Sequence, residues 1–373
     1  KNHELAVNYI MLYLVRGDFV SCKTKNRLLL LVSAVLLIGI VIAANAVMSN
    51  NTPIVSTAFI MDTVVEQKLY GKQAEQAAAE IEQRLREYEK RCSMYLPESE
   101  IDKINQNAGK GTVEVSQNTA KMIAQAKELC EESEGLFDIT IAPLTQLWGI
   151  TGENPQVPSQ QEIEQARSLV DYRDIIIEGN RVGLRREGQA MDLGAVAKGA
   201  ACDIVREVAE QYQITCGYVS IGGNLIVLKE TPMGKEKSYR FGIRDPQGTE
   251  AEYFATVSLN GKTMATTGTY ERWFEQDGKR YHHILDPRTG YPAESDLISV
   301  SVISENGLLA DCLSTTLFLE GKQAALSKMQ EEEYQLVIVD KEGTVFYSPS
   351  LEQSFEPNPE KEYQFICYQK DAE

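Results

Sequence analysis

The sequence predicts an α+β fold, in which one catalytic domain of mixed helices and antiparallel sheets follows a single N-terminal transmembrane helix. Helical patterns and hairpin-like strands are interspersed without a regular βαβ rhythm, which favours this class over a doubly wound parallel sheet. A chain of 373 residues, 43% of them hydrophobic, can bury a full core. We expect four segments: a cytoplasmic segment at 1–27, a transmembrane anchor or signal sequence at 28–48, the catalytic domain at 51–350 and a weakly ordered tail at 351–373.

The expected membrane segment is the apolar run from Leu28 to Met48, which contains no charged side chain. As a helix it would span about 31 Å, close to the hydrocarbon thickness of a bilayer. Three cationic residues lie just before it, within 23–27, so the positive-inside bias places the amino end in the cytoplasm and the catalytic domain outside. This predicts a single-pass protein of the cell membrane. A cleaved signal peptide is the alternative, because residues 44–46 resemble a small-x-small cleavage site.

The elements of the catalytic domain follow from periodicity, caps and turns. Ser99 with Asp102, and Ser159 with Glu162, have the spacing of capping boxes at helix starts. Helices are expected at 72–90, 99–108, 118–133, 159–170, 194–213 and 307–320. Strands are expected at 57–70 (one long strand or a pair), 181–184, 189–192, 217–228, 239–244, 253–266 with a hairpin turn at Asn260-Gly261, 280–285 and 297–304. A closing hairpin is expected at 335–348, with its turn at Lys341-Glu342-Gly343.

Charge and motif content exclude several classes of function. The net charge of −17 repels phosphate backbones, so nucleic acid is not an expected partner. Seven cysteines without CxxC spacing predict neither a zinc site nor a disulfide framework. The chain has no GxGxxG or GxxxxGK[ST] loop, and no GxSxG or HExxH motif. Any chemistry must therefore come from carboxylate, hydroxyl, lysine or histidine groups, together with a metal.

The helix expected at 307–320 carries a single carboxylate in apolar surroundings. Asp311 is the only acidic or basic residue in GLLADCLSTTLFL, so the helix is predicted to be buried. A buried carboxylate is costly unless a cation or several donors meet it. Thr315 lies one turn later on the same face, and two hard oxygen ligands of this kind suit Mg²⁺. The alternative is a carboxylate paired with a core arginine or with backbone N–H groups.

Two further segments combine glycine with polar groups. In MDLGAVAKGAACDIV, Asp192 ends a strand and Lys198 lies in the first turns of a helix whose small residues let a phosphate approach closely. An ordinary strand–turn–helix corner explains this pattern equally well. In GYVSIGGNLIVL, Gly222 and Gly223 interrupt an apolar strand, which indicates either close approach of a ligand or a structural bulge.

Residues 263–293 contain two of the three histidines in the chain. His282 and His283 point to opposite faces if they lie in a strand, so at most one of them faces a site. A lone histidine is more often a structural residue than a catalyst. The following Asp286-Pro287-Arg288-Thr289-Gly290 has the composition of a turn.

Taken together, these segments resemble the ApbE family of FAD:protein FMN transferases. The resemblance spans roughly residues 57–340 and rests on eight motifs in family order. They are FIMDT (59–63), CSMYLPESEIDKIN (92–105), GLFDITIAPLTQLWG (135–149), MDLGAVAKG (191–199), IGGN (221–224), ATTGTYER (265–272), HHILDPRTGYP (282–292) and ADCLSTTLF (310–318). Asn224 and Thr267 stand where the family often has Asp and Ser, which leaves fine specificity open.

The resemblance implies a set of site residues. Mg²⁺ would be held by the Ala195 carbonyl and the Asp311 and Thr315 side chains, and the catalytic groups would be His283, Lys198 and Asp311. The residues implied to contact FAD are Met61, Tyr95, Phe137, Asp138, Asp192, Lys198, Gly222, Gly223, Thr267, His283 and Leu285. The ring of Tyr95 or of Phe137 is expected to stack on the flavin or adenine.

The implied reaction is the Mg²⁺-dependent transfer of FMN from FAD to a threonine or serine hydroxyl, with release of AMP. Similar enzymes modify subunits of redox pumps and other exported FMN-binding proteins, so the expected partner is a separate acceptor flavoprotein. Two alternatives stay open at this point. One is an FAD pyrophosphatase that uses water in place of the hydroxyl, and the other is a flavin-binding protein without catalysis.

Overall fold

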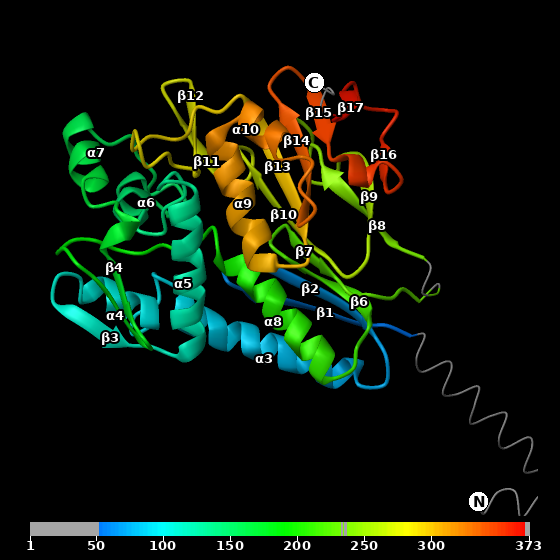
Figure 1. The fold of residues 1–373 in the computed structure, drawn as a ribbon, viewed down its shortest axis with the longest axis horizontal. Coiled ribbons are helices and arrows are strands. Elements are labelled where there is room, and N and C mark those ends of the chain that lie inside the picture. The colour runs from blue at the N-terminus through cyan, green and yellow to red at the C-terminus, as the bar shows by residue number, and fades with distance from the viewer. Residues whose placement is uncertain (1–51, 233, 235–236, 370–373) are drawn as a thin grey trace, which may run out of the picture. The chain divides into compact units, whose positions relative to one another are not determined.

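The computed structural model describes residues 52–232, 234 and 237–369, and those from Pro53 onward belong to one compact unit, Pro53–Glu373 (Figure 1). The segments expected at 1–27 and 28–48 lie outside the described residues. Within the described ranges, no helix is both long and apolar enough to cross a membrane.

A nine-stranded sheet is the centre of the described unit (Figure 1). Its neighbours are antiparallel, apart from the last pair, which is parallel. The strands in spatial order are β1 (Ile54–Ile60), β2 (Thr63–Tyr70), β6 (Cys216–Ile221), β7 (Asn224–Val227), β10 (Thr263–Gly268), β13 (Leu297–Ser304), β14 (Tyr334–Asp340), β15 (Thr344–Tyr347) and β17 (Gln364–Cys367). A mainly antiparallel sheet with helices confirms the predicted α+β class.

Three helices cover one face of this sheet: α3 (Ala74–Cys92), α8 (Ala197–Gln211) and α9 (Gly307–Glu320) (Figure 1). The apolar stripe predicted for the first of them is buried, and it comprises Ala74, Ala77, Ala78, Ile81, Leu85 and Tyr88. The predicted bounds of α9 are also confirmed, and this helix is buried on nearly all sides, as its uniform apolarity predicts.

The other face of the sheet packs on a second, three-stranded sheet. This sheet has the order β16 (Phe355–Pro357), β9 (Tyr253–Leu259) and β8 (Tyr239–Arg244). Leu225 and Val227 of β7 share a buried cluster with Phe254 and Val257 of β9. The central sheet is therefore a middle layer between helices and a smaller sheet.

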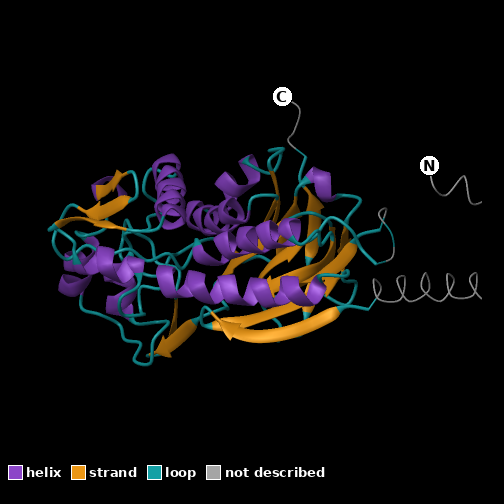
Figure 2. Cartoon of the chain, turned by 90° about the horizontal axis from the view of Figure 1, so that it is seen from below, coloured by secondary structure: helices purple, strands orange, loops and turns teal. Residues whose placement is uncertain are grey.

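The remaining elements lie mostly on the side of the molecule away from β15 and β17 (Figure 1). The helices are α4 (Glu100–Gln106), α5 (Gln117–Glu132), α6 (Ala142–Trp148), α7 (Gln160–Arg167) and α10 (Lys322–Ser327), with short 3₁₀ turns η1 (Tyr172–Asp174) and η2 (Pro349–Leu351). The strands are β3 (Gly111–Glu114), β4 (Ile175–Glu178) and β5 (Arg181–Leu184) in one small sheet, and β11 (Trp273–Gln276) with β12 (Lys279–His282) in a hairpin. Figure 2 shows the helices gathered along one side of the long central strands.

Capping residues define the helix starts that the sequence predicts. The Ser159 hydroxyl accepts a hydrogen bond from the Glu162 backbone N–H, and the Glu162 carboxylate accepts one from the Ser159 backbone N–H, which completes the capping box. Ser99 likewise accepts from the Asp102 backbone at the start of α4.

Several predicted strands differ from the structure. Residues 217–228 form two strands, because Gly222 and Gly223 both have positive φ and close a tight turn between β6 and β7. Asn260-Gly261 also forms a turn, but it joins strands of two different sheets rather than a hairpin. Residues 189–192 contribute only an isolated bridge at Ala190, and the strand expected at 280–285 ends at His282.

The C-terminal tail was expected to be weakly ordered, and the structure corrects this. Residues 355–357 and 364–367 form β16 and β17, which extend both sheets. The reason is aromatic packing: Phe365 and Phe355 lie beside each other and beside the core residue Phe254. No local sequence pattern indicates which strands β16 and β17 pair with, because both are short.

Candidate active site

Two glycines let helices α8 and α9 approach closely at the centre of the candidate site. A Cβ on Gly199 would overlap the carbonyl oxygen of Gly307, and a Cβ on Gly307 would overlap the carbonyl oxygen of Gly199. A larger residue at either position would therefore push the two helices apart. This contact brings the first turn of α8 against Asp311.

The Asp311 carboxylate is buried, with only 4% of the residue exposed, and Oδ2 accepts a hydrogen bond of 2.8 Å from the Gly199 N–H. In an uninterrupted helix this N–H would donate to the carbonyl of Ala195. The next residue, Ala200, does follow the helical rule and donates to Val196. In the described part of the chain, no backbone N–H donates to the Ala195 carbonyl, so this oxygen is left available beside Asp311.

Thr267 connects β10 to the same region of α9. Its hydroxyl lies 3.1 Å from the hydroxyl of Thr315 and 2.7 Å from that of Ser314. Ser314 in turn donates to the Asp311 backbone carbonyl. The structure thus places Thr267 of β10 against α9 at Thr315, which shares a helix face with Asp311 by its i, i+4 spacing.

This arrangement fits a hard divalent cation. A free carbonyl, a carboxylate and a hydroxyl are all oxygen donors of the kind that Mg²⁺ prefers, and Mg²⁺ takes its other ligands from water and phosphate. The described residues contain no group of three or more His, Cys, Asp or Glu side chains that could hold a metal. A metal here would therefore rely on Ala195, Asp311 and Thr315 together with its substrate.

A second carboxylate, which was not among the site residues predicted from the sequence, supports the start of α9. Asp203 of α8 accepts hydrogen bonds from the Gly307 and Leu308 N–H groups, at 2.8 and 2.9 Å. These N–H groups have no partner within their own helix. Asp203 lies one helical turn beyond Gly199. An acidic residue at this spacing, in a helix of small residues, is the sequence feature that could have indicated its role. It fixes the position of α9, and hence of Asp311.

His283 lies close to the charge of Lys198, whereas its neighbour does not. Burial, with a smaller contribution from the Lys198 ammonium, lowers the pKa of His283 to about 4. The imidazole is therefore neutral at pH 7, and Nδ1 lies 3.2 Å from the Arg272 carbonyl oxygen. His282 points elsewhere: Nε2 lies 3.1 Å from the Ala293 carbonyl oxygen, and its ring packs edge-on against Phe318.

Two tight turns lie at the end of the sheet next to this histidine. Met61 and Asp62 both have positive φ and close the β1–β2 hairpin, and Arg272 binds Asp62 through an ion pair of 2.9 Å. The neighbouring turn is Gly222-Gly223, where a Cβ on Gly222 would strike Thr63 but one on Gly223 would meet open space. These turns bring Met61, Gly222 and Gly223 to one end of the sheet.

Asp192 and Tyr95 lie within electrostatic range of each other, and Tyr95 also lies within range of Arg272 and Asp62. Asp192 Oδ1 accepts from the Gly194 N–H at 2.8 Å, and burial raises the pKa of its carboxyl group. Tyr95 is 64% exposed, and its hydroxyl lies 3.3 Å from that of Thr151. Its exposed ring is free to stack on a planar ligand.

Three residues expected to contact FAD have other roles in the structure. Phe137 is only 3% exposed and belongs to the main core, so its ring offers no stacking surface. Leu285 is 7% exposed and packs in a small cluster with Trp148. Asp138 uses its carboxylate to accept bonds from Thr140 and from the Tyr172 backbone, and burial raises its pKa. The motif positions of these residues gave no indication of their burial.

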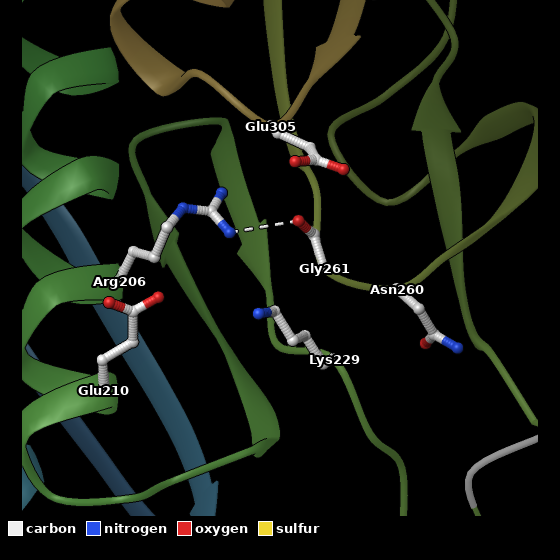
Figure 3. A pocket seen from close by; sticks show the side chains of 6 residues that line it. All are labelled: Arg206, Glu210, Lys229, Asn260, Gly261 and Glu305. Carbon is white, nitrogen blue, oxygen red and sulfur yellow. Dashed lines mark hydrogen bonds between the residues drawn. The ribbon is translucent and has the colours of Figure 1, made fainter.

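Two cavities among the described residues do not coincide with the Asp311 region. One, of about 370 Å³, lies near the far end of α8 from Lys198 (Figure 3). Its lining residues are Arg206, Glu210, Lys229, Asn260, Gly261 and Glu305. The other, of about 200 Å³, borders Asp138 and Arg288. We assign the candidate site by its convergent oxygen and nitrogen groups, because neither cavity contains a comparable set.

Comparison with known proteins identifies the family of the chain. The model of the ApbE family matches residues 61–338. The FAD:protein FMN transferase of Klebsiella pneumoniae is 33% identical over 313 residues, which cover 83% of this chain and 96% of that relative. The enzyme of the same name from Treponema pallidum is 30% identical over 289 residues, which cover 73% and 80% of the two chains.

Solved structures show the same fold. The ApbE protein of Thermotoga maritima superposes with a TM-score of 0.75 at 31% identity, covering 81% of this chain and 99% of that one. The flavin transferase ApbE from Vibrio cholerae has a TM-score of 0.72 at 26% identity, with the same coverage. The chain therefore belongs to the ApbE family.

Proposed function

We propose that this protein transfers FMN from FAD to a threonine or serine hydroxyl of an acceptor flavoprotein, in a Mg²⁺-dependent reaction that releases AMP. The observation that carries the proposal is the buried Asp311 carboxylate, whose only hydrogen-bond donor among the described residues is Gly199. A second ligand of opposite charge is what such a carboxylate requires. Family membership and the names of the relatives support flavin as the transferred group.

Mg²⁺ held by Ala195, Asp311 and Thr315 would supply positive charge to the pyrophosphate and to the departing AMP. Lys198 lies in the first turn of α8, where free N–H groups and the helix dipole also favour an anion. The ammonium and this helix start are therefore expected to orient the FAD phosphates. Gly199 supports this geometry, because the lack of a side chain lets α8 approach α9 and places Asp311 beside the start of α8.

In the reaction, the acceptor hydroxyl oxygen forms a bond to the FMN-side phosphorus. The bond from this phosphorus to the bridging oxygen breaks, and AMP leaves with that oxygen. The hydroxyl proton must pass to a base, and we assign this role to His283. Its low pKa keeps the ring neutral, so that it can accept a proton at pH 7.

The site of action is part of the proposal. The apolar run at 28–48 supports a single-pass anchor, with the catalytic domain on the outer side of the cell membrane. The acceptor would then be an exported or membrane flavoprotein, such as a redox-pump subunit.

The test uses the purified full-length chain with FAD, Mg²⁺ and the apo form of a redox-pump flavoprotein domain. AMP release and the intact mass of the acceptor are followed together, with an acceptor in which Thr is replaced by Val as the blank. A gain of one FMN mass with AMP release is expected. AMP release without a mass gain for any acceptor would instead identify an FAD pyrophosphatase. FAD binding without AMP release would identify a flavin-binding protein.

A further inference from the structure

Strand β1 is an open edge of the nine-stranded sheet. It pairs with β2 through a two-residue turn, so Ile60 lies opposite Thr63 and Ala58 lies opposite Val65. In such a hairpin the bonded pairs alternate, and the intervening residues direct their backbone groups outward. These residues are Val55, Thr57 and Phe59. The Arg86 guanidinium donates to the Phe59 carbonyl at 3.4 Å, which agrees with an outward direction for that oxygen.

This edge is also unusually apolar on its exposed face. Val55 is 68% exposed and Phe59 is 64% exposed, and Val64, directly opposite Phe59, is 49% exposed. Free edges are usually protected by charged residues, proline or bulges, because they otherwise pair with other chains. The sequence of β1, IVSTAFI, has no charge and no proline, and its register with β2 is unbroken.

The edge leads directly to the candidate active site. β1 ends at the Met61–Asp62 turn, and Arg272 binds this turn through the Asp62 carboxylate and also through the Asp62 carbonyl, at 3.2 Å. The Arg272 backbone carbonyl accepts a hydrogen bond of 3.0 Å from the backbone N–H of His283. A short chain of bonds therefore connects the end of the exposed edge with the proposed base.

We propose that β1 is the docking edge for the acceptor, an extended polypeptide segment that adds one strand to the sheet. Its backbone would pair with the outward groups of Val55 and Thr57, and its apolar side chains would cover Phe59 and Val64. Strand addition of this kind gives affinity through main-chain bonds and specificity through alternate side chains. The strand direction carries the accepting hydroxyl past the Met61–Asp62 turn toward His283. This inference rests on the proposed function, which requires an acceptor polypeptide at the site.

The other free edge of the sheet is less suited to this role. β17 lies eight strands from β1, beyond β13, β14 and β15, at the opposite edge of the sheet. A segment bound there could not deliver its hydroxyl to the site. A second copy of the chain could in principle cover β1, and so could the residues that precede it, so the experiment must separate these occupants from the acceptor.

The decisive variant is Thr57→Pro, with Thr57→Ala as the matched control. Proline removes the outward N–H and obstructs strand addition. The hydrogen bonds between β1 and β2 are kept, because Thr57 lies opposite Glu66 as a non-hydrogen-bonded pair. Alanine changes the side chain but keeps the N–H. We expect kcat/KM for the apo flavoprotein domain to fall about tenfold in Thr57→Pro, the effect of one or two lost hydrogen bonds. Thr57→Ala should stay within about twofold, and the affinity of both variants for FAD should equal that of the wild type.

A second variant and a second measurement complete the test. Phe59→Ser with Val64→Ser removes the apolar cover and should raise KM for the acceptor while FAD affinity is unchanged. Amide exchange at Val55 and Thr57 of the full-length chain should slow when the acceptor domain is added. Unchanged transfer kinetics in Thr57→Pro, or edge amides already protected in the free chain by its own residues or a second copy, would overturn the docking surface alone. A wild-type protein that modifies no acceptor would overturn the proposed function as well.

Discussion

The backbone N–H of Gly199 donates to the Asp311 carboxylate at 2.8 Å, across the contact between α8 and α9, and not to its helical partner Ala195. One hydrogen bond thus orients the carboxylate and leaves the Ala195 carbonyl available. Both groups are placed by close packing at Gly199 and Gly307, where no side chain fits. The candidate metal ligands therefore depend on the helix contact as much as on their own identity.

Replacing Asp311 by Ala should abolish Mg²⁺-dependent AMP release, with a loss of at least about 100-fold. Asp311→Asn is the matched variant, because it keeps the size and one acceptor oxygen but loses the charge. It should bind Mg²⁺ far more weakly while the fold is maintained. Isothermal titration with Mg²⁺ in the presence of FAD, alongside circular dichroism, checks both points. Full activity in the alanine variant would rule out the metal assignment.

Replacing Gly199 by Ala should destabilise the protein by about 1–3 kcal/mol, since the new Cβ overlaps the Gly307 carbonyl and the helices must separate. Gly152→Ala is the control, because Gly152 lies in an exposed loop and its Cβ would have an ordinary contact of 3.4 Å. Denaturant unfolding of both variants gives the comparison. Equal midpoints for the two variants would show that the α8–α9 contact yields easily.

Much of this architecture could be predicted because its signals are local. The buried face of α3, the capping box at Ser159 and the bounds of α9 each follow from residue type and spacing over a few positions. Asp311 was recognisable for the same reason, as one carboxylate in an apolar helix. The prediction that Thr315 lies on the same helix face as Asp311 needed only the i, i+4 spacing.

Other features depend on contacts between distant segments, and the sequence does not display these. Strand β17 is stabilised by contacts of Phe365 with Phe254 and Phe355, and both of these residues belong to the other sheet. Phe137 lies in a motif that suggests ligand contact, yet tertiary packing buries its ring. The bonds of Asp203 to the start of α9 join residues more than 100 positions apart. Pattern reasoning over short windows cannot resolve such pairings.

Asp203→Ala should lower stability by about 1–3 kcal/mol, because the Gly307 and Leu308 N–H groups lose their acceptor. It should also reduce Mg²⁺ affinity, since α9 carries Asp311. Glu207→Ala, one turn further along α8 with a side chain 70% exposed, is the control and should leave both quantities unchanged. Chemical denaturation and Mg²⁺ titration are the measurements. A variant with normal stability and normal Mg²⁺ binding would show that the start of α9 needs no such support.

His283 should make stability depend on pH between about 4 and 6.5. Its folded pKa of about 4 lies below the usual 6.5, so in this window the unfolded chain binds a proton that the folded chain does not. Stability contributed by neutral His283 therefore rises with pH from 4 to 6.5 and is lost again on acidification. His283→Gln should flatten the difference curve, measured as unfolding free energy against pH. His282, whose pKa burial also lowers, remains in both proteins and cancels in the comparison. An unchanged slope would mean that the imidazole is not held neutral.

Mg²⁺ binding and turnover should require the hydroxyl of Thr267 and not its methyl group. It lies 3.1 Å from the Thr315 hydroxyl and 2.7 Å from that of Ser314, so Thr267→Val leaves the buried Ser314 hydroxyl and the partly buried Thr315 hydroxyl without this partner. Thr267→Ser keeps the bonds and should retain Mg²⁺ affinity and turnover within about threefold, whereas Val should lower both by about tenfold or more. Because Val and Thr have the same shape, stability alone cannot explain a selective loss of Mg²⁺ binding. The measurement is Mg²⁺ titration of FAD-loaded protein, with thermal unfolding of the free protein as the reference. If Val binds Mg²⁺ as well as Ser does, then Thr267 does not orient Thr315, and the ligand set reduces to Ala195 and Asp311.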